Sequence, residues 1–503
     1  MKVLVANRGE IAVRIIRACR ELGLGTVAVF SECDRTALHT RLADEAWRLG
    51  PSPAADSYLR IDKIVAVARR SGAALVHPGY GFLAENAGFA QACVEAGVTF
   101  VGPRPDAIRT MGSKTAAREE AARAGVPIVP GSEMSLGAET PVAAVTAEAA
   151  RVGFPLLVKA VAGGGGKGMR MASGSDELEA AIRAARSEAA ASFGDSSVYL
   201  ERRLDGPRHV EVQILADDHG AVVPFVERES SIQRRHQKIV EESPAMNLDR
   251  RTRQQMAGAA VRIARAVRYS NAGTIEFLLD RDGRFYFLEM NTRLQVEHPV
   301  TEAVTGIDLV RWQLRIALGD RLTISEEQAL TPNGHAIECR IYAEDPDRGF
   351  LPAPGLIRAM TAPGGPGIRE DRGVSPEYEV PVFYDSLVSK LIAWGRDRPE
   401  ALTRLTRALA EYRLVGLTST VPFFQWLVQQ PDFVAGRVDT TYLDRVLASR
   451  DARPFVIPTP EVERDAAVAA ALAAWFRAHR ASAAPGTSAA GAWRAASRRD
   501  ALR

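Results

Sequence analysis

The segment from Thr274 to Asn291 has the sequence TIEFLLDRDGRFYFLEMN, and it decides the kind of sheet that this chain builds. Asp282-Gly283 is a strong two-residue turn signal, and alternating apolar residues flank it on both sides. We therefore predict a β-hairpin in which the turn pairs Arg281 with Arg284. Its two strands are expected to be antiparallel, with successive side chains on opposite faces of the sheet.

The same register places Glu276 directly across from Glu289, and Thr274 across from Asn291. Carboxylates at directly opposite positions have Cβ atoms about 5 Å apart and repel each other. A divalent cation between them removes this cost, and Mg²⁺ is the natural candidate because it binds carboxylate and amide oxygens together with phosphate. The alternative is a solvated face on which two charges coincide. The motifs that follow favour the cation.

Length and composition limit the classes of protein to consider. With 503 residues the chain is too long for one compact domain, and three domains are expected. A formal net charge of +3 gives no signature of nucleic-acid binding. The four cysteines lack the spacing of a zinc site or a disulfide framework, which fits a reducing compartment. No apolar run approaches the ~20 residues of a membrane span, so we expect a cytoplasmic protein that binds neither nucleic acid nor membranes.

Periodicity divides the chain into five regions. Short apolar strands alternate with helical segments over residues 1–111, which predicts a parallel α/β domain. Residues 112–203 hold a connecting helix and a glycine-rich loop, and residues 204–330 hold strands that include the glutamate hairpin. Residues 331–450 are expected to form a mixed β/α domain. Residues 451–503 are expected to be an alanine-rich helical tail or the start of a missing linker.

The glycine-rich loop spans residues 163–168, with Lys159 before it and Lys167 inside it. Consecutive glycines let backbone N–H groups approach phosphate oxygens, and the two lysines add positive charge. A flexible connector is the alternative. The loop is not a Walker motif, because neither serine nor threonine follows Lys167.

The segment after the hairpin, NTRLQVEHP, concentrates polar groups before an apolar helix, with Asn291, Arg293, Gln295 and Glu297 at alternating positions. An elaborate helix cap accounts for one or two of them but not for all four. The longer stretch EMNTRLQVEHPVTE resembles the signature of the biotin carboxylases, which are members of the ATP-grasp superfamily.

Other motifs agree with that family in order and spacing: ANRGEIAVRIIRAC, HPGYGFLAEN, KAVAGGGGKGMR, PRHVEVQ, ERESSIQRRHQKIVEE, GHAIECRIYAED and FYDSLVSKLI. The resemblance covers residues 1–450 and is strongest to the biotin carboxylase region of an acyl-CoA carboxylase α subunit. It implies an α/β and α+β multidomain fold, with an N-terminal parallel α/β domain, an ATP-grasp domain whose glycine-rich lid closes over ATP, and a C-terminal mixed β/α domain.

The resemblance also assigns roles to individual residues. It implies contacts with ATP from Lys114, Lys159, Gly164, Gly165, Gly166, Lys167, Glu201, Leu204, His209, Gln233 and His236. It implies that Mg²⁺, at two sites and replaceable by Mn²⁺, is held by Glu276, Glu289 and Asn291. Bicarbonate is expected to be positioned by Lys238, Arg293, Gln295 and the backbone of Val296. Glu297 resembles the general base, and Arg340 resembles the cation that stabilises the biotin enolate.

Two parts of the pattern leave alternatives open. The family commonly has a Glu-Lys-aromatic hinge beside the adenine, whereas this chain has Glu201-Arg202-Arg203-Leu204, so the adenine contact at Arg202 is undecided. The cluster RRHQK at residues 234–238 is either an exposed basic patch or part of the site. We favour the site, on the expectation that His236 and Lys238 share one strand face. His77, Tyr80, Tyr384 and Asp385 are expected to be structural.

The implied reaction is the ATP- and bicarbonate-dependent carboxylation of biotin through carboxyphosphate, the first half-reaction of an acyl-CoA carboxylase. The chain contains no AMKM-type biotinylation motif, so biotin is expected on another domain or a carrier protein. A carboxyltransferase and a second copy of the chain are the other expected partners. The tail GAWRAASRRDALR resembles the region after the carboxylase domain of longer α subunits, which suggests a truncated or divergent subunit.

Three alternatives to this function stay open. In the first, the chain is a component of another biotin-dependent carboxylase. In the second, it is an ATP-grasp ligase for a different carboxylate, and in the third, it is a nucleotide-binding scaffold without turnover.

Overall fold

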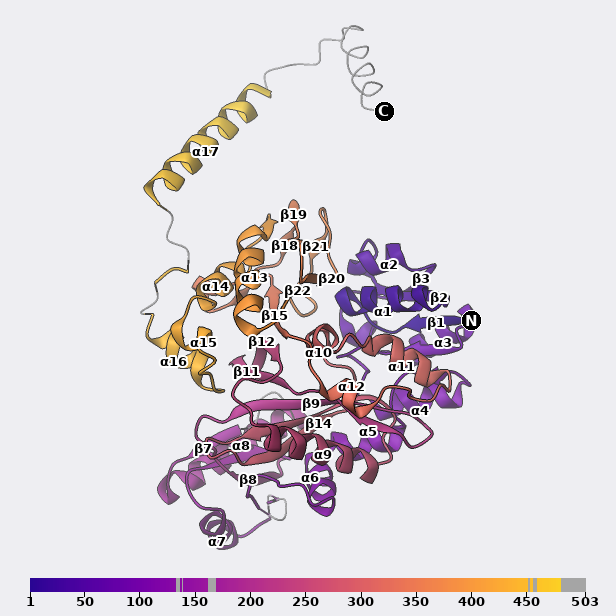
Figure 1. The fold of residues 1–503 in the computed structure, drawn as a ribbon, viewed down its shortest axis with the longest axis vertical. Coiled ribbons are helices and arrows are strands. Elements are labelled where there is room, and N and C mark those ends of the chain that lie inside the picture. Colours follow the sequence, from indigo (N-terminus) through magenta and orange to yellow (C-terminus); the bar gives the residue numbers. More distant parts are fainter. Residues whose placement is uncertain (133–135, 138, 162–168, 451–452, 456–458, 481–503) are drawn as a thin grey trace. The chain divides into compact units, whose positions relative to one another are not determined.

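The computed structural model describes residues 1–132, 136–137, 139–161, 169–450, 453–455 and 459–480 (Figure 1). The chain divides into two compact units, Met1–Arg453 and Pro454–Arg503. Within the second unit, helix α17 spans Pro460–Arg480, where the sequence predicts an alanine-rich helix. Among the described helices, none combines the length and the apolar character needed to cross a membrane.

The N-terminal region contains a five-stranded parallel sheet with the strand order β3-β2-β1-β4-β5. The strands are β1 (Lys2–Val5), β2 (Gly25–Ser31), β3 (Glu45–Gly50), β4 (Leu75–His77) and β5 (Thr99–Phe100). The main helices are α1 (Gly9–Glu21), α3 (Ile61–Ser71) and α4 (Ala87–Glu95). Val3 and Val5 face one hydrophobic core and Leu4 faces another. Burial on both faces explains the continuous apolar run of β1 and confirms the predicted parallel α/β domain.

A small antiparallel sheet with the order β7-β6-β8 follows. It consists of β6 (Leu156–Ala160), β7 (Met169–Ala172) and β8 (Val198–Arg202), and helix α8 (Ser175–Phe193) packs on it. Helices α5 (Pro105–Gly112), α6 (Lys114–Arg123) and α7 (Val142–Val152) precede or flank this sheet. The predicted phosphate-binding residues Gly164, Gly165, Gly166 and Lys167 lie outside the described residues.

The largest sheet has nine strands. Eight of them follow the order β14-β13-β9-β11-β12-β15-β22-β20, and β10 pairs only with β9. Its strands are β9 (Arg208–Ala216), β10 (Val222–Pro224), β11 (Arg228–Arg234), β12 (Gln237–Ser243), β13 (Asn271–Leu279), β14 (Phe285–Asn291), β15 (His335–Tyr342), β20 (Ile368–Arg372) and β22 (Leu387–Gly395). Because β12 pairs with β15, strands from regions 204–330 and 331–450 belong to one sheet.

Helices cover this sheet and short strands border it (Figure 1). Helix α9 (Arg250–Ala266) packs against β9 and β10, and α13 (Arg398–Glu411) packs against β15 and β22. The remaining helices are α2 (Leu38–Leu42), α10 (His298–Thr305), α11 (Leu309–Ala317), α12 (Glu326–Leu330), α14 (Val421–Leu427), α15 (Pro431–Val434) and α16 (Tyr442–Ala448). The short strands are β16 (Glu344–Asp345), β17 (Leu351–Pro352), β18 (Gly355–Leu356), β19 (Ala359–Thr361), β21 (Glu379–Val380) and β23 (Arg413–Val415).

The glutamate hairpin forms between β13 and β14, and Glu276 lies opposite Glu289 as predicted. The predicted turn is wrong by one residue, because Asp280 pairs with Arg284 and a three-residue loop connects them. Gly283 takes the left-handed conformation (φ +81°) that such a loop requires at its last position. A bulge next to Phe277 absorbs the extra residue, which restores the predicted register at the carboxylates.

Candidate active site

The site is centred on the half-buried ammonium group of a lysine among three carboxylates. The Nζ atom of Lys238, on β12, lies 2.7 Å from Oε1 of Glu276 and 2.8 Å from Oε1 of Glu297, and it also donates to Glu211. Burial disfavours the charged lysine, but the three carboxylates outweigh it and hold the pKa of Lys238 above its usual range. The lysine therefore stays positive, and the site combines one fixed cation with several acceptor oxygens.

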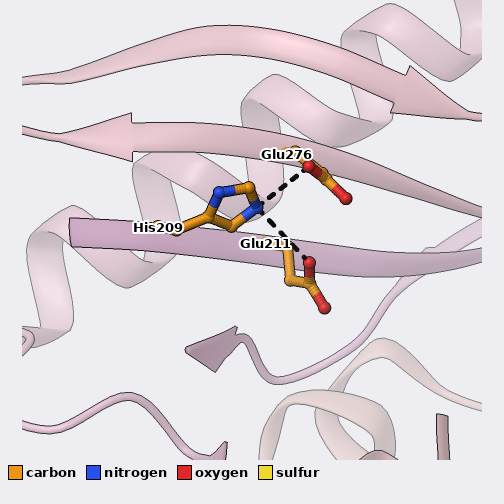
Figure 2. Close-up of side chains that lie close together, drawn as sticks. All are labelled: His209, Glu211 and Glu276. Atoms are coloured by element: carbon orange, nitrogen blue, oxygen red, sulfur yellow. Dashed lines mark ion pairs between the residues drawn. The ribbon is translucent and has the colours of Figure 1, made fainter. Parts of the chain in front are cut away.

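Glu211 brings a carboxylate that the sequence prediction missed. It lies directly opposite Glu276 in the β9–β13 ladder, so Glu211, Glu276 and Glu289 follow one another across three strands. His209 shares its face, with Nε2 2.9 Å from Oε2 of Glu276 and 3.7 Å from Oε2 of Glu211 (Figure 2). The alternation in the sequence HVEVQ already places these two side chains on one face, and this signal could have identified Glu211.

The protonation of His209 follows from its neighbours. Burial opposes the charged ring, but the charge of Glu276 outweighs burial and raises the pKa of His209 to about 9. For Glu276, burial favours the neutral acid, whereas Lys238 and His209 hold the pKa of its carboxyl group below its usual range. At neutral pH the pair is therefore an imidazolium and a carboxylate. His209, which was predicted to contact the nucleotide, is thus held by an ion pair with the carboxylate cluster.

The predicted metal ligands differ in how they are engaged. Glu276 accepts hydrogen bonds from Asn291 (2.8 Å) and Gln295 (2.6 Å) in addition to its cations. Glu289 is half-buried and forms no hydrogen bond or ion pair with a described residue. Burial and the charge of Glu276 raise the pKa of Glu289. Two facing carboxylates, one of them unpaired, form a donor set that fits a hard divalent cation such as Mg²⁺.

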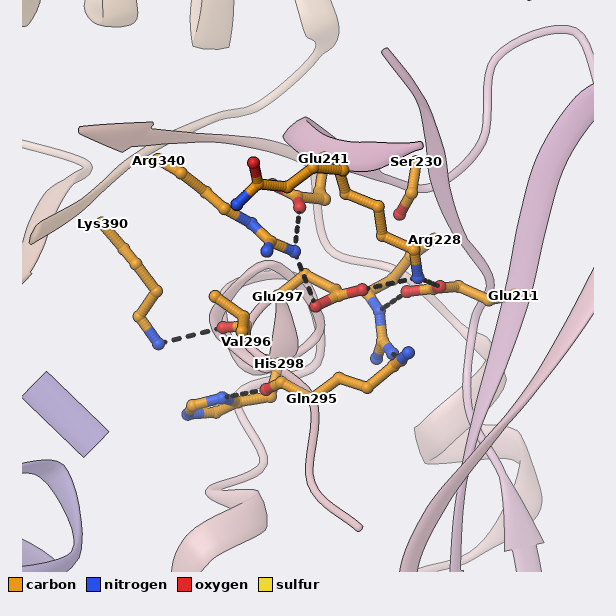
Figure 3. Close-up of polar contacts among 12 residues, drawn as sticks. Glu211, Arg228, Ser230, Glu241, Gln295, Val296, Glu297, His298, Arg340 and Lys390 are labelled. Carbon is orange, nitrogen blue, oxygen red and sulfur yellow. Dashed lines mark hydrogen bonds and ion pairs between the residues drawn. The ribbon is translucent and has the colours of Figure 1, made fainter. Parts of the chain in front are cut away.

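Glu297 lies at the start of α10, between two cations. Its Oε1 atom accepts from Lys238, and its Oε2 atom lies 3.1 Å from Nη2 of Arg340 on β15 (Figure 3). Burial favours the neutral acid, but Lys238 dominates among the charges that hold the pKa of Glu297 below its usual range. Glu297 is therefore ionised and able to accept a proton. Glu241, which was not predicted, holds Arg340 from the other side through an ion pair.

Gln295 and Arg293 are held by residues that the sequence did not reveal. Arg228 is fully buried and donates to Oε1 of Gln295 (2.6 Å) and to Oε1 of Glu211 (2.6 Å). Because Arg228 holds the amide oxygen of Gln295, the amide nitrogen of Gln295 is turned towards Glu276. Arg293 pairs with Glu85 of the N-terminal region (2.8 Å). A buried arginine whose partners lie on another strand and in the segment before α10 has no local sequence signal.

A cavity of about 540 Å³ opens beside this cluster and is lined by Arg293, Val296 and Arg340. Residues 7–11 and 80–82 of the N-terminal region form part of its wall, and residues 383–385 and 387 form another part. Tyr80, Tyr384 and Asp385, expected to be packing residues, therefore face a cavity, because the fold brings these distant loops together. His77 is fully buried and accepts a hydrogen bond from the amide of Gly79, as a structural residue does.

The other predicted nucleotide residues form no hydrogen bond or ion pair with the cluster carboxylates among the described residues, although the charge of Lys114 acts to lower the pKa of Glu289. Lys159 on β6 pairs with buried Glu201 on β8, and Glu201 also accepts from Arg118 (2.9 Å). Lys114 begins α6, Gln233 donates to the carbonyl of Ser230 (2.9 Å), and Leu204 is half-buried after β8.

The prediction that His236 shares a strand face with Lys238 is wrong. The β11–β12 turn places His236 in the left-handed conformation (φ +66°), where it is exposed. No hydrogen bond or ion pair joins it to a described residue. Its contact with the nucleotide stays a prediction.

Comparisons with known proteins agree along the chain. Residues 1–108 match the biotin carboxylase N-terminal domain, residues 113–325 match the ATP-binding domain of the carbamoyl-phosphate synthase L chain, and residues 338–445 match the biotin carboxylase C-terminal domain. The biotin carboxylase of a Nostoc species is 51% identical over 88% of this chain and 99% of its own length. The mitochondrial α subunit of methylcrotonoyl-CoA carboxylase from Dictyostelium discoideum is 48% identical over 88% of this chain and 63% of its own length.

Solved structures give the same result. A biotin carboxylase complex from Campylobacter jejuni superimposes with a TM-score of 0.85 at 43% identity, covering 88% of this chain and 98% of that chain. The biotin carboxylase domain dimer of Hydrogenobacter thermophilus 2-oxoglutarate carboxylase, in complex with MgADP, ADP and bicarbonate, has a TM-score of 0.85 at 45% identity. That match covers 91% of this chain and 99% of the other.

Proposed function

This chain belongs to the biotin carboxylase family of ATP-dependent ligases, and we propose that the cluster around Lys238, Glu297 and Arg340 is its catalytic centre. Its reaction is the carboxylation of biotin, the first half-reaction of biotin-dependent carboxylases. The observation that supports the assignment most directly is the ionised carboxylate of Glu297, held between the cations of Lys238 and Arg340 beside a cavity.

In the first stage, Glu297 takes the proton of bicarbonate. Lys238, Arg293, Gln295 and the Val296 backbone hold the anion while its oxygen attacks the γ-phosphorus of ATP, and ADP leaves. Glu276, Glu289 and Asn291 are the residues that would hold Mg²⁺, which when bound offsets negative charge on the phosphate oxygens. The fixed lysine needs no rearrangement as charge develops, because three carboxylates already hold it in place.

In the second stage, carboxyphosphate releases CO₂ and phosphate within the site. The phosphate takes the proton from biotin N1′, and the ureido enolate attacks CO₂. Arg340 lines the cavity and places its guanidinium where it can neutralise the enolate oxygen. Glu241 and Glu297 hold that guanidinium from two sides, so its position does not depend on substrate. Excluding water protects carboxyphosphate from hydrolysis.

The partners follow from the chemistry. A biotin carrier domain or protein must deliver its ring to the cavity, because this chain lacks a biotinylation motif. A carboxyltransferase then uses the product and selects the acceptor, for which we propose an acyl-CoA. The Hydrogenobacter relative is a dimer, and we propose that this chain also pairs with a second copy.

The test is ADP release by the purified chain with MgATP and bicarbonate, with and without free biotin. We expect bicarbonate-dependent release that biotin stimulates. Glu297→Gln keeps the shape of the side chain but removes the base, so it should abolish this release while MgATP still binds. Loss of MgATP binding in that variant would count against the base assignment. A folded wild-type chain that binds MgATP but shows no bicarbonate-dependent release would favour a scaffold without turnover.

A further inference from the structure

Two consecutive backbone carbonyls next to the catalytic base are each held by a buried side chain. The Nδ1 atom of His298 lies 2.8 Å from the carbonyl oxygen of Gln295. The Nζ atom of Lys390 lies 2.9 Å from the carbonyl oxygen of Val296. In Figure 3, Lys390 and His298 lie on one side of this segment, and Glu211 and Arg228 lie on the other.

The peptide geometry makes these contacts informative. In a planar trans peptide the carbonyl and the following N–H point in opposite directions. The N–H of Val296 therefore points away from His298, and the N–H of Glu297 points away from Lys390. Neither N–H donates a hydrogen bond to any residue that the structure describes, although Glu297 is only 2% exposed. A buried N–H without a partner is costly, which indicates that an acceptor belongs there.

Lys390 connects three regions of the chain. It lies on β22 and is fully buried, with Nζ 3.1 Å from Oε1 of Glu10, at the start of α1, and 4.0 Å from Oδ2 of Asp371 on β20. It also lies 5.8 Å from the centre of the Tyr80 ring. Its position is thus set from the N-terminal region and from two strands of the large sheet. A side chain held this firmly is suited to fixing the carbonyl of Val296.

His298 acts as a neutral donor. Burial, together with the charges of Lys390 and Arg14, holds the pKa of His298 well below its usual range. A neutral ring carries one N–H, and the nearby carbonyl of Gln295 requires it at Nδ1. Its Nε2 atom has no hydrogen-bond partner among the described residues. Nε2 lies 4.0 Å from Oε2 of Glu302, so the hydrogen bond of the ring is the one at Nδ1.

We propose that Lys390 and His298 are positioning residues for bicarbonate. They hold the carbonyls of Val296 and Gln295 so that the N–H groups of Val296 and Glu297 both face the anion, beside the carboxylate that accepts its proton. This inference rests on the proposed function and adds the Glu297 amide as a donor. Neither Lys390 nor His298 contacts substrate. Both act through the backbone of the segment between them.

The variants separate positioning from folding. Lys390→Met alone would leave Glu10 buried with an uncompensated charge, so Glu10→Gln accompanies it to keep the pair neutral. His298→Leu removes the ring donor, whereas His298→Asn keeps an amide N–H close to the position of Nδ1. Arg398→Met is the matched control, because Arg398 is also buried and donates to two carbonyls, those of Phe433 and Val434, away from the cluster. It is made together with Glu242→Gln, since Arg398 also pairs with the buried carboxylate of Glu242 (2.6 Å).

The measurement is bicarbonate-dependent ADP release by the full chain, with KM determined separately for bicarbonate and MgATP. We expect the Glu10/Lys390 double variant and His298→Leu to raise the bicarbonate KM about 10- to 100-fold, with the MgATP KM nearly unchanged. His298→Asn should recover most of the loss. Arg398→Met should lower the melting temperature without changing the bicarbonate KM.

Two results would overturn the inference, and they are distinguishable. If the wild type turns over but the double variant and His298→Leu change both KM values equally, or match Arg398→Met, the two residues are only structural. If the wild type shows no bicarbonate-dependent release, the proposed function fails and the inference fails with it.

Discussion

Among the directly opposed glutamates of the large sheet, two pairs differ in how their charges are accommodated. Glu276 faces Glu289 across β13 and β14, and Glu241 faces Glu338 across β12 and β15. Glu276 is surrounded by donors from Lys238, His209, Asn291 and Gln295 and stays ionised. Glu338 is fully buried, and its oxygens accept no hydrogen bond from a described residue.

The difference shows what opposed carboxylates mean in a sheet. Burial raises the pKa of Glu338 well above its usual range, and burial raises the pKa of Glu241 to about 7 although Arg340 opposes it. Both members of the second pair are thus shifted towards the protonated form, which relieves their repulsion. In the first pair Glu276 keeps its charge beside Lys238 and His209, and that charge together with burial raises the pKa of Glu289, so a cation between the two carboxylates is favourable. Opposition alone does not predict a metal site. The donors and the exposure around each pair decide between the two outcomes.

The largest effect is expected from neutralising the ionised member of the first pair. Glu276→Gln deprives Lys238 and His209 of a counter-ion and removes a metal ligand, so turnover should fall at least about 100-fold. Steady-state ADP release with saturating MgATP and bicarbonate measures this, with circular dichroism confirming the fold. Activity within a few-fold of the wild type would mean that the charge of Glu276 is not needed for turnover.

A smaller effect is expected at the partner carboxylate. Glu289→Gln removes a charge that no described residue pairs, so it should not destabilise the fold. It should raise the Mg²⁺ concentration for half-maximal activity about tenfold. Titrating Mg²⁺ at fixed ATP tests this, and an unchanged Mg²⁺ dependence would remove Glu289 from the ligand set.

The buried pair Glu241 and Glu338 should make the free energy of unfolding depend on pH. A carboxyl group whose pKa is raised on folding stabilises the protein fully below its unfolded value of 4.5 and loses that contribution as pH rises towards the folded pKa. Glu338→Gln cannot titrate, so near pH 4.5 it should match the wild type. Above that pH it should gain stability relative to the wild type by up to about 1.4 kcal/mol per pH unit.

Urea unfolding at a series of pH values between 4.5 and 7 gives the two free-energy curves to compare. Parallel curves would mean that Glu338 is ionised in the folded chain. They would make the two glutamate pairs alike and so remove the contrast between them.

The smallest effect is expected on catalysis by the same variant. Since burial raises the pKa of Glu338 well above its usual range and its oxygens accept no hydrogen bond from a described residue, Glu338→Gln should leave kcat within about twofold of the wild type. The comparison uses the ADP-release assay at neutral pH, with Glu276→Gln measured alongside. A loss similar to that of Glu276→Gln would show that the buried pair takes part in the reaction.

Local patterns account for the parts of the site that were predicted correctly. The two-residue period of a strand places Glu276 opposite Glu289, and the register survived an error in the turn because a bulge compensated for it. The alternation in HVEVQ would have added Glu211 to the set. In contrast, His236 was misplaced, because a left-handed turn residue interrupts the alternation on which the prediction relied.

The sequence by itself determined the order of strands and helices, the family, and the facing carboxylates of the hairpin, because these depend on neighbours within one or two elements. Only the tertiary structure decided which carboxylates are ionised, which arginine orients Gln295, and how Lys390 reaches Val296. Charges, burial and hydrogen bonds at these positions come from residues up to hundreds apart in the chain, such as Glu10 and Lys390. A pKa or a fixed peptide plane depends on that assembled environment, which no local pattern records.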